Sequence, residues 1–255
     1  MTRQSIVADA STVLNEDDYA ISVSTLMLKD VEKALKVIDK YEINRMLDLG
    51  CGFGGMTRLV ANFFSATEAY GADMNSDRLK VAESRSLQTL KTDIEVDKLP
   101  FPPNYFDLVM SLGVIEHLRY YDNLISESYR IIKVGGYFLL SWPNLGSYTQ
   151  RIALLLGYQP NDVVISKEVY VGTIYNSGER SSEADHIHAA TLKAIKQLLE
   201  YYNFTPVAVK RGNPRIVGKY SNWTPLITAA GRLCPLSLAR RLIIVAKKEK
   251  GGKQG

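Results

Sequence analysis

The chain has 255 residues, of which 46% are hydrophobic and 23% are charged, and its formal net charge is +4 at pH 7. This is the composition of a globular protein and not of a disordered or fibrous one, and the length suits one large α/β domain. Part of the small basic excess lies close to the C-terminus. We interpret it as a solvated surface, so it does not predict a nucleic-acid partner.

The first residues lack the apolar core of a signal peptide and include acidic side chains, which transit peptides avoid. The apolar stretch 223–246 is interrupted by prolines and arginines and falls short of the ~20 apolar residues that a transmembrane helix needs. We therefore expect a cytoplasmic protein without a transmembrane segment. The mixed apolar and basic C-terminal third leaves open a peripheral contact with a membrane surface.

Strands and helices are predicted to alternate along the first part of the chain. Apolar residues three and four apart predict a helix over 24–41, within an N-terminal helical extension at 1–42. The segment KVGG is interpreted as a turn that leads into a strand ended by Pro143, because proline cannot donate to the ladder. The predicted strands are 45–49, 68–73, 90–93, 106–112 and 137–142, and the predicted helices follow residues 54, 77 and 120. This alternation indicates a mostly parallel sheet with helices on both faces.

The alternation is interrupted at residues 145–188, which we interpret as an inserted lid over the site. After it, Thr191 is predicted to cap a helix and Asn203 to end it in the left-handed conformation. The inner face of that helix is predicted to comprise Leu192, Ile195, Leu199 and Tyr202. A strand at 205–210 follows, and the run LIIVAKK is predicted to be a closing strand whose charged end faces solvent. These make seven strands in a single domain over 1–255.

A glycine-rich turn carries the first functional signal. Gly50, Gly52 and Gly54 directly follow the first strand and precede a helix, where glycines permit positive φ and a close approach of the backbone to a ligand. Asp73 ends the second strand, the position from which nucleotide-binding units accept hydrogen bonds from ribose. Gly50, Gly52 and Gly54 have the spacing G-x-G-x-G, whereas dinucleotide sites favour G-x-G-x-x-G/A. Gly55 also completes the dinucleotide pattern, so the glycine spacing alone only suggests the type of ligand.

Four segments together resemble the class I S-adenosylmethionine-dependent methyltransferases, in particular the broad group that modifies small molecules. LDLGCGFGG resembles the first motif, YGADMNSDRL the acidic second, TDIEVDKLPFPPNYFDLVMSLGVIEHL the third and fourth, and ESYRIIKVGGYFLLSWPN the helix, turn and fifth strand. They cover residues 43–144, and HIHAATLKAIKQLLEYYNF resembles the family's later helix. The resemblance implies a doubly wound, Rossmann-like fold, S-adenosyl-L-methionine as cofactor and methyl transfer to a small-molecule acceptor.

The resemblance also implies roles for the residues of the first two motifs. Asp48 would bind the amino group of the methionyl part through water, and Asp73 would accept from the ribose hydroxyls. The glycine loop would approach the methionyl part closely, and we interpret the cysteine in it as a small apolar filler with little freedom to form a disulfide. The loop residues concerned are Gly50, Cys51, Gly52 and Gly54.

The later motifs would complete the cofactor site. By the same resemblance, Met74 would lie against the adenine face, Asp93 would accept from its exocyclic amine, and the N–H of Ile94 would meet a ring nitrogen. Ser111 and Leu112 would line the floor near the sulfonium. All of these positions follow predicted strands, and open parallel sheets bind ligands at the carboxyl ends of their strands.

Little acid–base chemistry is obligatory when the methyl group is already activated, and alignment of the acceptor is the main requirement. Candidates for a general base are Glu116, His117, His186 and His188. His117 belongs to VIEHL, which is common in the resembling family whatever the substrate, so a structural role competes with a catalytic one. His188 could point into the cleft or merely help to start the next helix.

Several absences favour a small-molecule acceptor. No Asn/Asp-Pro-Pro-Tyr follows the fourth strand, no cysteine is placed for attack on a pyrimidine, and the cysteines and histidines show no metal-site spacing. We therefore predict no metal. An acceptor pocket is predicted from the lid tyrosines and from polar and aromatic neighbours, namely Tyr148, Tyr158, Tyr170, Tyr175, Trp142, Asn144, Arg151 and Arg180.

Two alternatives remain open at this stage. The first is a non-catalytic S-adenosylmethionine-binding protein or partner subunit, which would keep the cofactor motifs and lose the acceptor pocket. The second is a dinucleotide-dependent dehydrogenase, which would need a second catalytic region that we do not find in the sequence. The sequence predicts neither the acceptor atom nor the oligomeric state.

Overall fold

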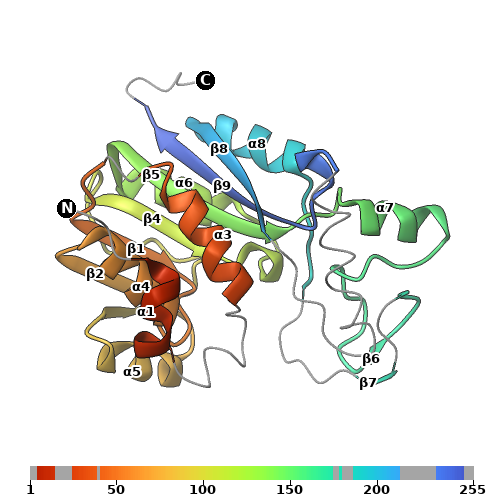
Figure 1. Cartoon of the computed structure of the whole chain (residues 1–255), viewed down its shortest axis with the longest axis horizontal. Coiled ribbons are helices and arrows are strands. Elements are labelled where there is room, and N and C mark those ends of the chain that lie inside the picture. The colour runs from red at the N-terminus through yellow and green to blue at the C-terminus, as the bar shows by residue number, and fades with distance from the viewer. Residues whose placement is uncertain are drawn as a thin grey trace.

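The structure is a computed structural model that describes residues 5–14, 25–38, 41–174, 178–179, 186–212 and 234–249. Its main sheet has seven strands in the order β3-β2-β1-β4-β5-β9-β8 (Figure 1). The strands are β1 (Arg45–Leu49), β2 (Glu68–Asp73), β3 (Gln88–Lys91), β4 (Phe106–Leu112), β5 (Ile132–Pro143), β8 (Phe204–Gly212) and β9 (Arg241–Lys248). The pairs from β3 to β5 are parallel, and β9 runs antiparallel to both of its neighbours. The predicted α/β fold with a mostly parallel seven-stranded sheet is confirmed.

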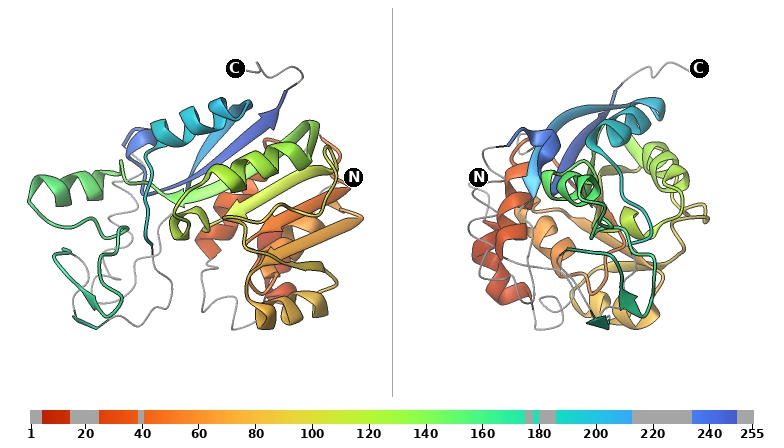
Figure 2. Two further views of the ribbon diagram at one scale, coloured as in Figure 1. Left: turned by 180° about the vertical axis from the view of Figure 1, so that it is seen from behind. Right: turned by 90° about the vertical axis from the view of Figure 1, so that its right-hand side faces the viewer.

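Helices cover both faces of this sheet (Figure 2). One apolar cluster joins the sheet to α1 (Ile6–Val13), α3 (Thr25–Leu35), α4 (Gly55–Phe64) and α5 (Ser76–Ser84). A second cluster joins the opposite face to α6 (Asp122–Ile131) and α8 (Leu192–Tyr201). Because the central strands are buried on both faces, they are apolar at nearly every position and do not alternate.

The strand bounds predicted for β1, β2 and β4 agree with the structure, and so does the cap of α8. The Thr191 hydroxyl accepts from the N–H of Ala194 at 3.3 Å, and Asn203 has φ 63°. The strand β3 begins two residues earlier than predicted, because Gln88 pairs with Tyr70 of β2. The helix α1 lies within the predicted N-terminal helical extension, although no separate helix was predicted at its position.

The prediction of a turn at KVGG is wrong, because β5 runs continuously through it. The register between β4 and β5 shifts at this point, and Gly135 has φ 86°. A Cβ on Gly136 would lie 2.8 Å from the carbonyl oxygen of Asp107. The two glycines therefore allow a bulge and a close approach of the strands, not a reversal of the chain.

The prediction that the charged end of β9 faces solvent is also wrong. Lys248 is 7% exposed, and its Nζ donates to the carbonyl oxygens of Tyr129 at 2.7 Å and Ile132 at 2.9 Å, and to Asn104 Oδ1 at 3.0 Å. The ammonium also lies 4.4 Å from the centre of the Tyr129 ring. Burial lowers the pKa of Lys248. Three acceptors and an aromatic face replace the water that this lysine loses.

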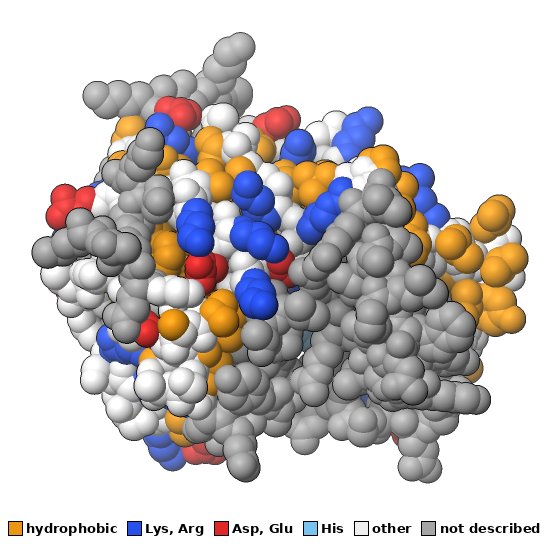
Figure 3. All heavy atoms as spheres, viewed as in Figure 1, with side chains coloured by type: hydrophobic (Ala, Val, Ile, Leu, Met, Phe, Trp, Pro, Cys, Tyr) orange, Lys and Arg blue, Asp and Glu red, His pale blue; other side chains and the backbone are white. Residues whose placement is uncertain are grey.

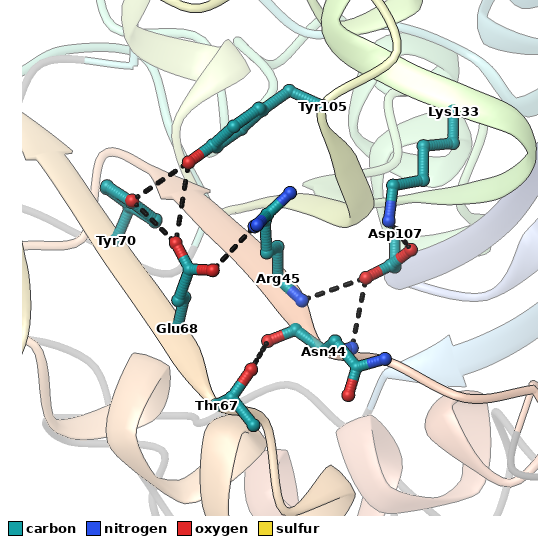
Figure 4. Close-up of polar contacts among 8 residues, drawn as sticks. All are labelled: Asn44, Arg45, Thr67, Glu68, Tyr70, Tyr105, Asp107 and Lys133. Carbon is teal, nitrogen blue, oxygen red and sulfur yellow. Dashed lines mark hydrogen bonds and ion pairs between the residues drawn. The ribbon is translucent and has the colours of Figure 1, made fainter.

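Paired charges join the strands at the amino edge of the sheet (Figure 4). Asp107 Oδ2 accepts from the backbone N–H groups of Asn44 at 3.0 Å and Arg45 at 2.8 Å, and its Oδ1 lies 2.6 Å from Lys133 Nζ. The Arg45 guanidinium pairs with Glu68 at 2.6 Å. These contacts link the start of β1 to β2, β4 and β5.

The insertion lies beyond the carboxyl end of β5 (Figures 1 and 2). It contains α7 (Tyr148–Leu155) and a small antiparallel pair, β6 (Val169–Tyr170) with β7 (Gly178–Glu179). Both cysteines, Cys51 and Cys234, are free. Within the described ranges, no helix has the length and apolarity needed to cross a membrane.

Removing the ammonium of Lys248 should destabilise the protein. Lys248→Met keeps much of the apolar stem but leaves three buried acceptors without their donor, so we expect the free energy of unfolding to fall by roughly 2–4 kcal/mol. Lys247→Met on the same strand is the matched control and should change it by less than about 0.5 kcal/mol. Urea unfolding of both variants measures the difference. Equal effects would mean that Lys248 is in fact solvated.

Candidate functional site

The glycine loop after β1 is constrained by conformation and by packing. Gly50 has φ 82° and Gly54 has φ 76°, a region that other residues rarely adopt. A Cβ on Gly50 would lie 2.4 Å from Val114 Cγ2, and a Cβ on Gly54 would lie 2.5 Å from Leu87 Cδ1. At Gly52, by contrast, no atom of the described residues outside its chain neighbours lies within 4 Å of an added Cβ. The loop is therefore packed at both ends and open at its middle residue.

Asp73 connects this loop to the end of β2. Its Oδ2 accepts from the N–H of Gly52 at 3.0 Å and its Oδ1 accepts from the N–H of Asn75 at 2.9 Å. The side chain is buried. Each carboxylate oxygen has a second lone pair, so Asp73 can still accept from hydroxyls of a ligand while it holds the loop.

Asp48 is the second buried carboxylate at this edge. The Thr57 hydroxyl, in the first turn of α4, donates to Asp48 Oδ2 at 2.6 Å. Burial, together with the nearby charge of Asp73, raises the pKa of Asp48 to about 7, against the lowering effect of the Thr57 bond. None of the groups that act on this pKa is a cation. Two carboxylates thus lie beside one loop, and a positive charge bound there would stabilise their ionised forms.

The predicted adenine-side residues lie around the end of β3. The N–H of Thr92 donates to the carbonyl of Asp73 at 3.1 Å, which places Asp93 and Ile94 just beyond Asp73. Met74 is 66% exposed, so it is not a core residue. Asp93 is exposed and its Oδ1 accepts from the N–H of Glu95 at 3.0 Å. Their contacts with a cofactor stay a prediction.

Ser111 and Cys51 make contacts within the protein. The Ser111 hydroxyl donates to the carbonyl of Leu49 at 3.0 Å, which joins the ends of β4 and β1, while Leu112 beside it is partly exposed. Cys51 Sγ would lie 2.7 Å from a Cβ on Gly71, so the thiol fills space against β2. Burial raises the pKa of this thiol well above its usual range. Cys51 is therefore no nucleophile.

The candidate bases come together in the structure although they are about 70 residues apart in sequence. Glu116 and His117 lie in η1 (Ile115–His117), just after β4. The carbonyl of Glu116 accepts from the N–H of His188 at 3.2 Å, and the rings of His117 and His186 have centroids 5.0 Å apart. His188 is exposed and its ring lies 6.3 Å from that of Tyr121.

Arg241 is a site residue that the sequence analysis did not select. It lies at the start of β9, and its Nη2 is 3.4 Å from Glu116 Oε1. Because β9 is antiparallel to β5, Arg241 pairs with Pro143 and reaches the carboxyl edge of the other strands. Burial, together with the charge of Glu116, raises the pKa of Tyr121 to about 12. Tyr121 is therefore neutral at pH 7 and no base.

The chain is similar in sequence to known methyltransferases. Residues 47–140 match the family model described as a methyltransferase domain. The chain is 32% identical over 102 residues to the fatty-acid O-methyltransferase of Mycolicibacterium smegmatis, covering 38% of this chain and 36% of the relative. It is also 32% identical over 104 residues to a ubiquinone/menaquinone biosynthesis C-methyltransferase of Stutzerimonas stutzeri, covering 38% of this chain and 41% of the relative.

A similar solved structure is the S-adenosylmethionine-dependent methyltransferase of Archaeoglobus fulgidus, with a TM-score of 0.56, 20% identity and coverage of 91% of this chain and 97% of that one. At this identity the likeness shows the fold. Residues 47–140 form a class I S-adenosylmethionine-dependent methyltransferase domain. S-adenosylmethionine is accordingly the cofactor of this methyltransferase domain. The chain spans well under half of the length of each of these two curated relatives.

Beyond the methyltransferase domain, two residues predicted to line the acceptor pocket are instead structural. Trp142 is buried and its Nε1 donates to the carbonyl of Ala190 at 3.1 Å. Asn144 is buried and its Nδ2 donates to the carbonyls of Ser237 and Ala239, each at 2.8 Å. Both side chains join the end of β5 to the segments beside it. The predicted lid residues Tyr175 and Arg180 lie outside the described residues.

Removing the charge of Asp48 should stabilise the methyltransferase domain without its cofactor. Asp48→Asn keeps an oxygen that can accept from Thr57 and removes a buried charge, so the free energy of unfolding should rise. Since a raised folded-state pKa means that stability is lost as pH rises towards about 7, the gain should be largest at pH 8.

The gain from Asp48→Asn should narrow by roughly 2–3 kcal/mol between pH 8 and pH 5, because wild-type Asp48 takes up a proton in the folded state over this range. Urea unfolding across the pH series measures it. A gain that is independent of pH would show that the Asp48 pKa is not raised.

Proposed function

We propose that this chain is an enzyme that transfers the methyl group of S-adenosylmethionine to a small-molecule acceptor. The observation that carries the proposal is the convergence of two buried carboxylates, Asp48 and Asp73, on a loop open at Gly52. S-adenosylmethionine brings a sulfonium and an ammonium, which supply the positive charge that these carboxylates lack. When bound, it supplies an already activated methyl group.

The protein's own residues would then bind and orient. In this proposal Asp48 faces the ammonium, Asp73 accepts from the ribose hydroxyls, and the backbone at Gly52 approaches the methionyl part. The lid at 145–188 would exclude water and hold the acceptor. Among the candidate bases, His188 is the most exposed and would take up a proton from an acceptor, whereas Glu116 is held by Arg241.

The same observation disfavours a dinucleotide-dependent dehydrogenase. A dinucleotide places its anionic pyrophosphate at the glycine loop and the following helix N-terminus. Here that position is flanked by Asp48, whose pKa is already raised by burial and by Asp73. A further negative group would add to this repulsion. A non-catalytic binder would share the cofactor site and would differ only in lacking turnover.

We propose further that the acceptor has an apolar chain. The end of α7 and the turn after it leave a group of large apolar side chains exposed, namely Ile152, Leu154, Leu155, Leu156 and Tyr158. Figure 3 shows apolar side chains at the edge of the molecule where α7 lies. Such a patch marks a binding surface more often than a plain solvated face. One curated relative is named for fatty acids, which are apolar chains with a polar head.

Cofactor binding tests the first proposal directly. Calorimetric titration should show micromolar binding of S-adenosylmethionine and S-adenosylhomocysteine and none of NAD(H). Asp73→Ala should weaken both sulfur ligands by roughly 10–100-fold, because it removes charged hydrogen-bond acceptors. Asp77→Ala is the matched control, since this carboxylate in the first turn of α5 is 88% exposed and pairs only with Lys80 among the described residues.

Asp73 also holds the glycine loop, so circular dichroism must first show that Asp73→Ala folds. Binding of NAD(H) alone, or equal losses in Asp73→Ala and Asp77→Ala, would contradict the cofactor assignment. Bound S-adenosylmethionine without methyl transfer to any acceptor would favour the non-catalytic alternative.

Acceptor length tests the second proposal. With isotopically labelled S-adenosylmethionine, methyl transfer to long saturated fatty acids should exceed transfer to short ones, because each methylene placed on an apolar surface contributes up to about 0.8 kcal/mol. The double variant Leu155→Ser with Leu156→Ser should reduce the dependence of methyl transfer on chain length, because it should raise the KM for long fatty acids. Val37→Ser, at an exposed apolar residue far along the chain, should leave it unchanged. Transfer that is independent of chain length would contradict an apolar acceptor.

A further inference from the structure

Three side chains with metal-binding atoms meet at the edge of the candidate site. Glu116 and His117 come from η1, and His186 comes from the end of the insertion. One carboxylate oxygen and one imidazole nitrogen from each histidine all lie within 4.8 Å of one another. The rings of His117 and His186 are inclined at 67°. Tertiary folding alone produces this group, which explains why the sequence showed no metal-site spacing.

The carboxylate of this group has an unused oxygen. Glu116 is 2% exposed, and its Oε2 has no hydrogen-bond partner among the described residues. Its Oε1 is engaged by Arg241 at 3.4 Å, so only Oε2 is left without a protein partner among these residues. A buried carboxylate oxygen without a partner is costly, and such an atom in a native fold calls for a ligand.

We propose that Glu116, His117 and His186 bind a divalent transition metal ion, with Zn²⁺ as the reference case. Imidazole nitrogens and a carboxylate oxygen are ligands that zinc prefers, and three protein ligands leave a position open. Ligand atoms around tetrahedral zinc are ~3.4 Å apart, so the three side chains must close by roughly 1 Å. Both histidines are partly exposed, so their rings are not enclosed by the core.

The site adjoins the region assigned to the methyl donor. Glu116 Oε1 would lie 3.7 Å from a Cβ on Gly113, which directly follows Leu112 at the end of β4. A metal held by these three side chains would offer its open position to an acceptor oxygen and would lower the pKa of a hydroxyl bound there. This role rests on the proposed function, whereas metal binding itself does not.

To test this, the full chain is first stripped of metal with a chelator. It is then titrated with Co²⁺ and afterwards with Zn²⁺. We expect one Co²⁺ per chain, visible absorption of the intense tetrahedral kind, and displacement by Zn²⁺. His117→Ala and His186→Ala should each lower the affinity by on the order of 100-fold or more, since even outer contacts of a metal site contribute 10–100-fold. His188→Ala is the matched control in the same segment, and it should bind normally.

The readout needs no methyl donor, so its result is separate from that of the cofactor titration. Binding that is absent, or that His188→Ala weakens as much as His186→Ala does, overturns the metal site. Normal metal binding together with no affinity for S-adenosylmethionine would overturn the proposed function and leave the metal site standing.

Discussion

Uncompensated negative charge at the carboxyl ends of β1 and β2 is the constraint on which the rest of this site depends. Asp48 and Asp73 are buried beside a loop that packing and hydrogen bonds hold in one conformation. Burial raises the pKa of Asp48 to about 7, so near neutral pH the folded chain bears a cost there. Sites that bind a cationic ligand commonly accept such a cost, because the ligand removes it on binding.

The opposite edge of the sheet has the reverse arrangement. There Asp107 accepts from two backbone N–H groups and pairs with Lys133, while Glu68 pairs with Arg45 (Figure 4). Charges at the amino edge are thus matched within the chain, whereas at the carboxyl edge no cation acts on the buried Asp48. In this fold the amino edge supplies stability and leaves the carboxyl edge free for binding.

Sequence patterns predicted those features of the fold that depend on residues close together in the chain. The apolar runs of β1, β2 and β4, the glycine loop and the cap of α8 each depend on residues close in sequence, and all were predicted correctly. The predicted solvation of Lys248 was wrong because its acceptors come from α6, β5 and the loop before β4. The turn at KVGG was wrong because a bulge uses the same glycines as a turn does.

The candidate acceptor side could be predicted only in part. Glu116, His117, His186 and His188 were selected one by one, as residue types suited to a base. Their grouping depends on the path of the insertion, and Arg241 on the direction of β9, neither of which has a local sequence signal.

The strand β9 has at each end a cationic side chain that binds groups on other elements. Arg241, at its start, reaches Glu116 at the carboxyl edge, and Lys248, at its end, reaches carbonyls near the amino edge. Since side chains alternate along a strand, a shift of register by one residue would turn both of them to the opposite face of the sheet. A single deletion within β9 would therefore leave at most one of the two cations in its place, whereas point substitutions remove either cation with the strand intact.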